Sequence, residues 1–179
     1  MKAVENLFWK NGFEGTSYAD LTKATGLGKG SLYSAFGNKQ ALYKRALETY
    51  IASELEILGG LLLNGLEDDP ASWRDRLTGF LNGAIDAVEQ RQDRRGCFIC
   101  NAAIELAPFD PAIEEMVQSV FEKLKGALMM VLAPLQDDAR ITKIAEQLLA
   151  TYLGMRVMAK AGSTPESLAV VRDSTLDGI

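Results

Sequence analysis

Apolar residues recur at three- and four-residue steps along most of this chain, which is the spacing of one helix face. The steps are clearest in two long segments, from Pro111 to about Leu132 and from Ile141 to Ala161. No segment shows the sustained alternation of apolar and polar residues that is typical of strands. The pattern therefore predicts an all-α protein.

Residues that start and stop helices divide this pattern into elements. Asn38 is placed to cap a long helix that runs to about Leu58. A short helix is expected from about Cys97 to Leu106, between a glycine and a proline. Three further helix starts are marked by a proline in its favoured first-turn position: Asp69-Pro70, Asp110-Pro111 and Thr164-Pro165.

The most informative stretch is TSYADLTKATGLGKGSLYSAFGNK, residues 16–39. Ser17 and Asp20 fit a capping box, in which the serine oxygen accepts from a free backbone N–H and the acid lies in the first turn. Gly26 and Gly28 allow the chain to reverse through positive φ angles. The stretch therefore predicts two short helices joined by a tight glycine turn.

The second short helix is expected from about Lys29 to Phe36. Leu32 and Phe36, four residues apart, hold it to the core and leave its polar side chains facing away. Two helices in this arrangement form a helix-turn-helix, which places its second helix in the major groove of DNA.

The run GFEGTSYADLTKATGLGKGSLYSAFGNKQAL, residues 12–42, resembles the DNA-binding domain of TetR-family transcriptional regulators. The resemblance is strong over residues 3–47 and weaker around residues 96–111. It implies a three-helix head over residues 1–47 and a helical effector-binding and dimerisation domain over residues 48–179. The chain opens inside the expected first helix, so we expect an earlier turn to precede Met1.

The distribution of charge supports the same assignment independently. Residues 1–47 hold seven Lys and Arg and three acids, a net charge of +4, whereas the remaining residues hold 12 and 21, a net charge of −9. A cationic head favours DNA phosphates, and an acidic body repels them.

Composition argues against catalysis and metal binding. The chain has no histidine, which removes Ser-His-Asp and Cys-His nucleophilic systems and the commonest zinc ligand. No GxxxxGK[ST] phosphate loop is present, and Gly26, Gly28 and Gly30 do not follow a strand. We predict no enzyme activity, no metal and no cofactor. Two cysteines, no signal-peptide organisation and no apolar run near the ~20 residues of a membrane span suit the cytoplasm.

Cys97 and Cys100 have the CxxC spacing, which puts both thiols on one face of a helix. Two buried core residues are one interpretation. The other is a thiol sensor, favoured by the helix N-terminus and by Arg94 and Arg95 just before it, since both features lower a thiol pKa. Arg91 completes an arginine cluster that we expect to be a solvated loop.

The resemblance implies roles for individual residues. The expected DNA contacts are Thr16, Ser17, Lys29, Gly30, Ser31, Tyr33, Ser34 and Lys39. The expected effector-pocket residues, each of which core packing would also explain, are Trp73, Phe80, Phe98, Asn101, Ile104, Met116 and Phe121. A homodimer is expected through the two long apolar helices, at Val120, Leu124, Leu128, Leu148, Tyr152 and Met155.

These expectations combine into one functional prediction. The chain is expected to be a homodimeric repressor that binds a palindromic double-stranded operator and is released by a small-molecule or thiol-reactive effector. The alternative is a helical sensor or protein-interaction module of the same fold that does not bind an operator.

Overall fold

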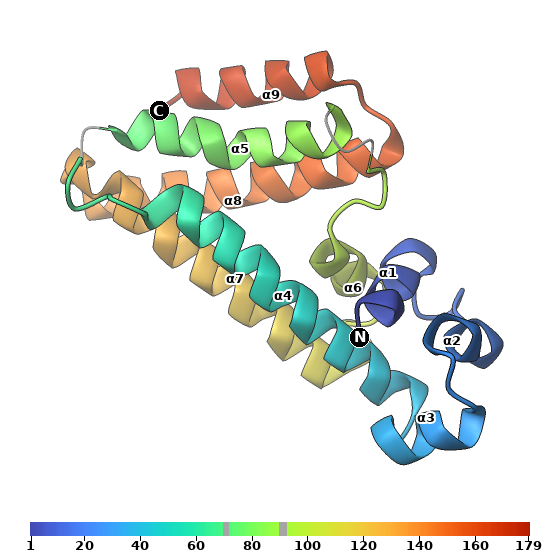
Figure 1. The fold of residues 1–179 in the computed structure, drawn as a ribbon. Coiled ribbons are helices and arrows are strands. Elements are labelled where there is room, and N and C mark those ends of the chain that lie inside the picture. The colour runs from blue at the N-terminus through green and yellow to red at the C-terminus, as the bar shows by residue number, and fades with distance from the viewer. Residues whose placement is uncertain (70–71, 90–92) are drawn as a thin grey trace. The chain divides into compact units, whose positions relative to one another are not determined.

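The computed structural model describes residues 1–69, 72–89 and 93–179, and all of Tyr33 except its side chain. These residues form helices and no strands, so the predicted all-α class is confirmed (Figure 1). The helices are α1 Lys2–Asn11, α2 Tyr18–Thr25, α3 Lys29–Phe36, α4 Lys39–Leu63, α5 Trp73–Glu89, α6 Phe98–Glu105, α7 Pro111–Leu132, α8 Asp138–Ala161 and α9 Pro165–Asp177, with a short 3-10 turn at Ala133–Leu135. The predicted helix start at Pro70 and the loop role of Arg91 lie outside the described residues.

Most helix ends lie close to their predicted positions, and α4 is the main exception. It continues five residues beyond the predicted end near Leu58, through Gly59 and Gly60 to Leu63. Each glycine costs a helix interior about 1 kcal/mol relative to alanine. Leu58 and Leu62, one turn apart, are both buried, and their burial holds this part of the helix together.

Contacts divide the chain into two compact units. The first contains residues 1–54 and 97–117, and the second contains residues 55–96 and 118–179. The short helix α6 and the start of α7 therefore pack with the N-terminal helices, although residues 55–96 separate the two segments along the chain.

An aromatic cluster forms the core of the first unit. The Tyr43 ring lies edge-on to Phe8 at 5.1 Å, to Phe13 at 5.5 Å and to Phe98 at 5.2 Å between ring centroids. Edge-to-face pairs of this kind favour a fixed geometry. Phe98 comes from α6, so the cluster joins α6 to α1 and α4.

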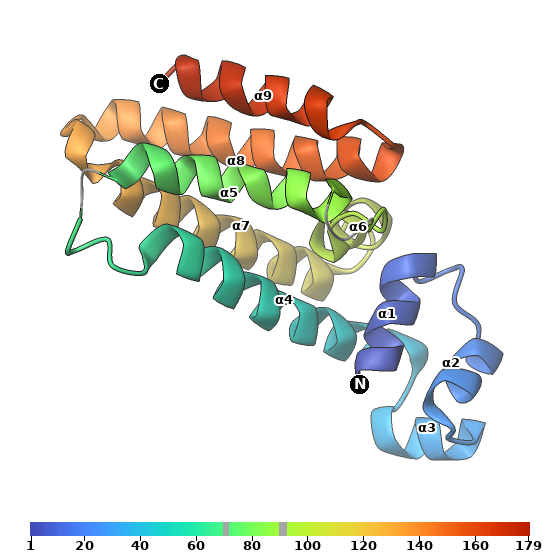
Figure 2. The same cartoon turned by 45° about the horizontal axis from the view of Figure 1, so that its top comes forward.

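The second unit is a layer of helices in which α5, α8 and α9 lie side by side (Figure 2). Phe80 of α5 stacks on Tyr152 of α8 with ring centroids 4.3 Å apart. The Arg172 guanidinium of α9 donates to the side-chain oxygen Oδ1 of Asn82 of α5 at 2.7 Å. No helix in the described part of the chain is long and apolar enough to cross a bilayer.

The side chains predicted to form the dimer interface lie inside this second unit. Val120, Leu124, Leu128, Leu148, Tyr152 and Met155 are all buried within the single chain. The apolar pattern of α7 and α8 therefore reports their packing inside one chain. A second copy would have to use other, exposed positions of these helices.

Candidate nucleic-acid interface

The first helix of the helix-turn-helix begins with the predicted capping box. Ser17 Oγ accepts from the Asp20 N–H at 3.1 Å, and Asp20 Oδ2 accepts from the Ser17 N–H at 2.9 Å. The hydrogen bond between the two side chains and that backbone bond hold the pKa of the Asp20 carboxyl below its usual value. The start of α2 is thus fixed by the exposed Ser17 and the half-buried Asp20.

The turn that follows needs one glycine in a left-handed conformation. Gly26 has φ of +70° and caps α2, whereas Gly28 does not have a positive φ. The prediction that both glycines adopt positive φ is therefore right for Gly26 only. Gly37, with φ of +82°, follows the last residue of α3.

Helix α3 covers the predicted range, from Lys29 to Phe36, and has two distinct faces. Leu32 is buried and Phe36 is half-buried, so this face is held against the head. The exposed residues of α3 predicted to contact DNA are Lys29, Gly30, Ser31 and Ser34. The side chain of Tyr33, also predicted to contact DNA, lies outside the described part of the structure.

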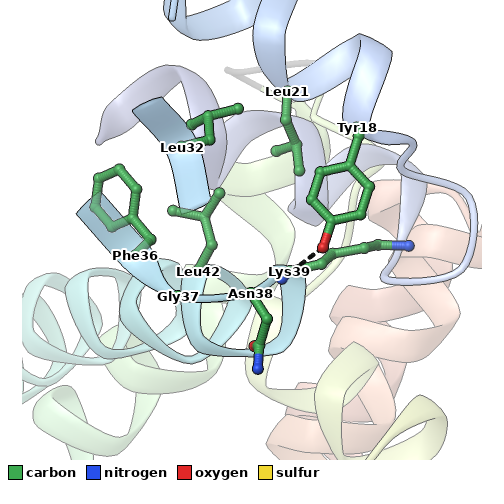
Figure 3. A pocket seen from close by; sticks show the side chains of 8 residues that line it. All are labelled: Tyr18, Leu21, Leu32, Phe36, Gly37, Asn38, Lys39 and Leu42. Carbon is green, nitrogen blue, oxygen red and sulfur yellow. Dashed lines mark hydrogen bonds between the residues drawn. The ribbon is translucent and has the colours of Figure 1, made fainter. Parts of the chain in front are cut away.

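A small cavity of about 10 Å³ lies between α2, α3 and the start of α4 (Figure 3). Leu21, Leu32, Phe36 and Leu42 give it apolar walls. A space of this size holds no more than about one water molecule. It belongs to the packing that holds α3 and is far too small for an organic effector.

The start of α4 places a second cation next to α3. Asn38 Oδ1 accepts from the Ala41 N–H at 2.8 Å, which caps the helix as predicted. The Lys39 N–H donates to the Tyr18 hydroxyl at 3.2 Å (Figure 3). The Lys39 ammonium lies 4.4 Å from the centroid of the Phe13 ring, a distance that favours a cation–π contact.

Lys29 is held in a similar way. Its ammonium lies 5.3 Å from the centroid of the Tyr18 ring. By contrast, Lys2 pairs with Glu5, and Lys44 pairs with Asp110 at 3.2 Å, so acids of the protein neutralise these two cations. The charge available to phosphates near α3 therefore includes Lys29 and Lys39.

Thr16 differs from the other predicted contacts because its side chain is fully buried. Its hydroxyl donates to the Gly12 carbonyl oxygen at 2.7 Å, inside the connection between α1 and α2. A buried hydroxyl cannot reach a phosphate, so we remove Thr16 from the contact set. Its role is to hold the turn that leads to Ser17.

Gly30 stands out among the exposed residues of α3. It does not have a positive φ, and a Cβ built on it would meet no described atom within 4 Å. The described part of the fold thus does not require glycine at this position. A missing side chain there instead leaves room for a partner to approach the helix backbone.

The predicted effector residues are divided between the two units. Trp73, Phe80 and Phe121 lie in the second unit, and Phe98, Asn101, Ile104 and Met116 lie in the first. Ile104 is 71% exposed, which does not fit the wall of an enclosed pocket, and we withdraw it. Phe98 is fully buried in the aromatic cluster, and the Asn101 amide donates to the Trp9 carbonyl oxygen at 3.5 Å.

Cys97 and Cys100 are both reduced and buried at the start of α6. Cys97 is the N-cap residue of this helix, and the Tyr50 hydroxyl donates to its sulfur at 3.9 Å. A helix N-terminus and a hydroxyl donor both favour a thiolate, whereas burial opposes it. The structure therefore keeps both interpretations of the CxxC motif open.

Sequence reasoning missed two acids at the corner between α6 and α7. Glu105 accepts from backbone N–H groups of Phe13 and Glu14, and Asp110 accepts from the Gln40 side chain at 2.6 Å. Their partners lie 70 or more residues away in the chain. No local pattern links residues so far apart.

Two family models match the chain. Residues 1–46 match the model described as bacterial regulatory proteins of the tetR family, and residues 74–175 match the tetracyclin repressor-like C-terminal domain. The chain belongs to the TetR family. Its members are DNA-binding transcriptional regulators and not enzymes.

Individual relatives agree with this assignment. The Escherichia coli (strain K12) HTH-type transcriptional repressor ComR is 28% identical over 179 residues, which cover 95% of this chain and 82% of ComR. A cysteine mutant of the TetR-family regulator CifR, solved with 26-base-pair double-strand operator DNA, has a TM-score of 0.81 and 24% identity, covering 98% of this chain and 93% of that chain. The reduced form of E. coli NemR has a TM-score of 0.79 and 21% identity, covering 98% and 93%. The two solved structures show that the chain has the TetR fold.

Proposed function

We propose that this TetR-family regulator is a homodimeric repressor that binds a palindromic operator through α3 and the start of α4 and is released by an effector. The observation that carries the proposal is the exposed face of α3, which contains Lys29, Ser31 and Ser34. Between them lies Gly30, where no side chain covers the helix backbone. The similarity to the repressor ComR and to the regulator CifR, which was solved with operator DNA, supports this choice.

Each group has a distinct role in the proposed contact. Lys29 and Lys39 bind phosphates, and Ser31, Tyr33 and Ser34 reach base edges or phosphates in the major groove. Ser17 presents the N-terminus of α2, where backbone N–H groups favour an anion. Phosphate contacts fix the position of the head, and base contacts supply the sequence preference.

Binding to the DNA that flanks the regulator's own gene tests the proposal, with fluorescence anisotropy over a series of salt concentrations. Lys29→Ala and Lys39→Ala should each weaken binding on all sequences and reduce the salt slope by about one unit. Lys143→Ala is the matched control, because Lys143 is exposed on α8 in the other unit. Unchanged affinity and salt slope in both head variants would remove these residues from the interface.

The alternative function, a sensor or interaction module without an operator, predicts a different result. Wild-type protein would then bind flanking DNA no more tightly than unrelated DNA at every salt concentration.

The proposed dimer uses exposed small residues of α8 in place of the buried positions inferred from the sequence. Ala150, Gly154 and Ala161 are exposed along one side of the helix together with Val157, which is 44% exposed. A Cβ on Gly154 would meet no described atom within 4 Å, so a second helix has room to approach. Val170 of α9, 65% exposed, adds apolar surface.

Sedimentation distinguishes this surface from the core. Gly154→Glu should give folded monomers, because the charge enters only the interface between copies. Leu148→Glu should unfold the protein, because it places a charge in the core of a single chain. A Gly154→Glu variant that remains dimeric at tens of micromolar concentration would place the interface elsewhere. A dimer places two recognition helices about one DNA turn, ~34 Å, apart, which explains why the operator is proposed to be palindromic.

We propose a small molecule as the effector, bound either in the first unit, against some of Phe98, Asn101 and Met116, or in the second unit, against some of Trp73, Phe80 and Phe121. Helix α4 contributes residues to both compact units, so it offers a continuous path to the head. A ligand that binds the folded state raises its melting temperature with concentration, and an inducer must also lower operator affinity. Compounds that raise the melting temperature but leave operator affinity unchanged are not effectors.

A thiol-reactive effector is the second candidate, supported by the Tyr50 hydroxyl at the Cys97 sulfur and by the N-cap position of Cys97. Among the fold neighbours, NemR was solved in a reduced form and CifR as a cysteine mutant. Oxidants or electrophiles should then release the operator from wild-type protein. A double Cys97→Ser, Cys100→Ser variant that responds in the same way would rule this candidate out.

A further inference from the structure

The carboxylate of Glu105 is held by the backbone of the N-terminal head. Its Oε1 accepts from the Phe13 N–H at 2.8 Å and from the Glu14 N–H at 3.0 Å, and its Oε2 accepts from the Phe13 N–H at 3.0 Å. Phe13 and Glu14 belong to the connection between α1 and α2. Glu105 itself is the last residue of α6, and all these residues lie in one compact unit.

The position of Glu105 on its own helix is unfavourable. A helix C-terminus carries partial negative charge, so a carboxylate there is disfavoured. A carboxylate also gains most from short hydrogen bonds to backbone N–H groups. The hydrogen bonds from Phe13 and Glu14 therefore explain why an acidic residue stands at the end of α6, where the helix alone would disfavour it.

Gly12 completes this site. Its φ is +77°, and a Cβ built on it would lie 2.9 Å from each carboxylate oxygen of Glu105. The backbone conformation favours glycine, and a side chain at this position would also displace the Glu105 carboxylate. The connection between α1 and α2 is thus shaped to receive Glu105.

The connection leads directly to the proposed DNA contacts. Phe13, next to Gly12, supplies the ring under the Lys39 ammonium. Thr16 donates back to the Gly12 carbonyl oxygen, and the next residue, Ser17, caps α2. A displacement of residues 12–14 would therefore move both the α2 N-terminus and the support of Lys39.

We propose that Glu105 is a positioning residue for DNA binding, whose carboxylate fixes the connection between α1 and α2 and so sets the orientation of α2 and α3. It touches no DNA itself. Operator affinity then depends on a side chain of α6, a helix within residues 74–175, which match the C-terminal domain of the family. This inference rests on the proposed operator-binding dimer, because orientation matters most when two heads must engage one site.

Asp110 holds the same head from a second point. It accepts from the Gln40 side chain at 2.6 Å and pairs with Lys44, both on the first turns of α4. It also caps α7 by accepting from the Ala112 N–H at 3.0 Å. Because Asp110 holds α4 independently, loss of the Glu105 carboxylate should loosen the connection at residues 12–14 without unfolding the unit.

The test compares DNA carrying the full palindrome with DNA carrying one half-site, using Glu105→Ala and Glu105→Gln. We expect Glu105→Ala to weaken full-site binding about tenfold relative to half-site binding, since freely oriented heads seldom engage both half-sites together. Glu105→Gln keeps one acceptor oxygen and should give a smaller loss. Glu115→Ala is the control, because Glu115 is an exposed acid of α7 in the same unit.

Hydrogen exchange supplies an independent measurement. The amides of Phe13 and Glu14 should exchange faster in Glu105→Ala than in wild type or Glu115→Ala. A double-mutant cycle with Gly12→Ala should show strong coupling, because the added methyl group meets the carboxylate only when Glu105 is present.

Each outcome decides between explanations. An equal fractional loss of full-site and half-site binding would show a merely structural role and overturn the inference. The same conclusion follows if the ratio of the two affinities is unchanged from Glu115→Ala. If wild-type protein binds no flanking DNA, the proposed function fails and the inference fails with it. If wild-type protein binds the operator but Glu105→Ala loses full-site and half-site binding equally, only the inference about Glu105 fails.

Discussion

Replacement of Tyr43 by phenylalanine should stabilise the protein. The Tyr43 side chain is fully buried in the aromatic cluster, and its hydroxyl has no hydrogen-bond partner among residues 1–69, 72–89 and 93–179. A buried hydroxyl without a partner costs about 1–3 kcal/mol in protein mutational data. Removing one oxygen leaves the ring contacts with Phe8, Phe13 and Phe98 in place. We expect a gain of about 1 kcal/mol at pH 7, or about 2–4 °C in melting temperature for a chain of this length.

The advantage of Tyr43→Phe should grow at alkaline pH. Burial, aided by the nearby Glu105 carboxylate, raises the pKa of Tyr43 well above its ordinary value near 10. The unfolded chain therefore releases this proton near pH 10 while the folded chain keeps it. Between pH 10 and the folded pKa, wild type should lose about 1.4 kcal/mol per pH unit relative to Tyr43→Phe. Below pH 10 the difference between the two proteins should not depend on pH.

Urea titrations at pH 7, 10.5 and 11.5 measure both effects, and two other buried tyrosines serve as controls. The Tyr50 hydroxyl donates to the Cys97 sulfur, so Tyr50→Phe should change stability little at pH 7. The Tyr152 hydroxyl accepts from the buried Arg156 at 3.1 Å, so Tyr152→Phe should destabilise by about 1–3 kcal/mol. The reasoning is refuted if Tyr43→Phe destabilises the protein at pH 7, because the hydroxyl must then make a favourable contact in the folded state.

Two further predictions concern the head. Gly30→Ala should weaken operator binding at least severalfold, yet leave the melting temperature unchanged or slightly higher because alanine favours helix. Gly59→Ala, in the interior of α4, is the control, and equal operator binding by both variants would contradict the close approach of DNA at Gly30. Burial alone would raise the pKa of Asp110, but hydrogen bonds from Gln40 and Lys44 lower this pKa below its usual value. The Asp110 carboxylate therefore stabilises the fold above the unfolded pKa of about 4, and this stabilisation is lost as the pH falls through the folded pKa. Asp110→Asn should therefore cost about 1–3 kcal/mol at pH 7 and progressively less below pH 4 in urea titrations, and a cost that does not change with pH would exclude the charge as its origin.

The sequence was sufficient for local features whose causes lie within a few residues. The capping box of Ser17 and Asp20 depends on contacts three residues apart, and the turn at Gly26 depends on one backbone angle. The range of α3 follows from these signals together with the spacing of Leu32 and Phe36. The predicted family is confirmed by the two matching models.

Features set by distant contacts could not be predicted in the same way. The apolar pattern of α8 shows that Leu148 and Met155 must be buried, but it does not say by what. In the structure α5 and α9 pack against α8 within one chain, so these side chains are already covered. Thr16 presents a similar case, because only the fold shows that its hydroxyl turns inward to the Gly12 carbonyl oxygen.

Gly12 and Gly30 of the head differ in whether contacts within the chain explain why the residue is glycine. Gly12 is explained by the chain itself, because its positive φ disfavours any side chain and a Cβ there would displace the Glu105 carboxylate. Gly30 has neither reason among the described residues, although alanine would suit its helix better. Because Gly30 lies on the exposed face of α3 that is predicted to contact DNA, we expect the groove to be the reason for glycine there, and the comparison of Gly30→Ala with Gly59→Ala tests this expectation. If the Glu105 carboxylate positions the connection between α1 and α2 as proposed, its loss should also weaken the DNA contacts that α3 is proposed to make at Gly30.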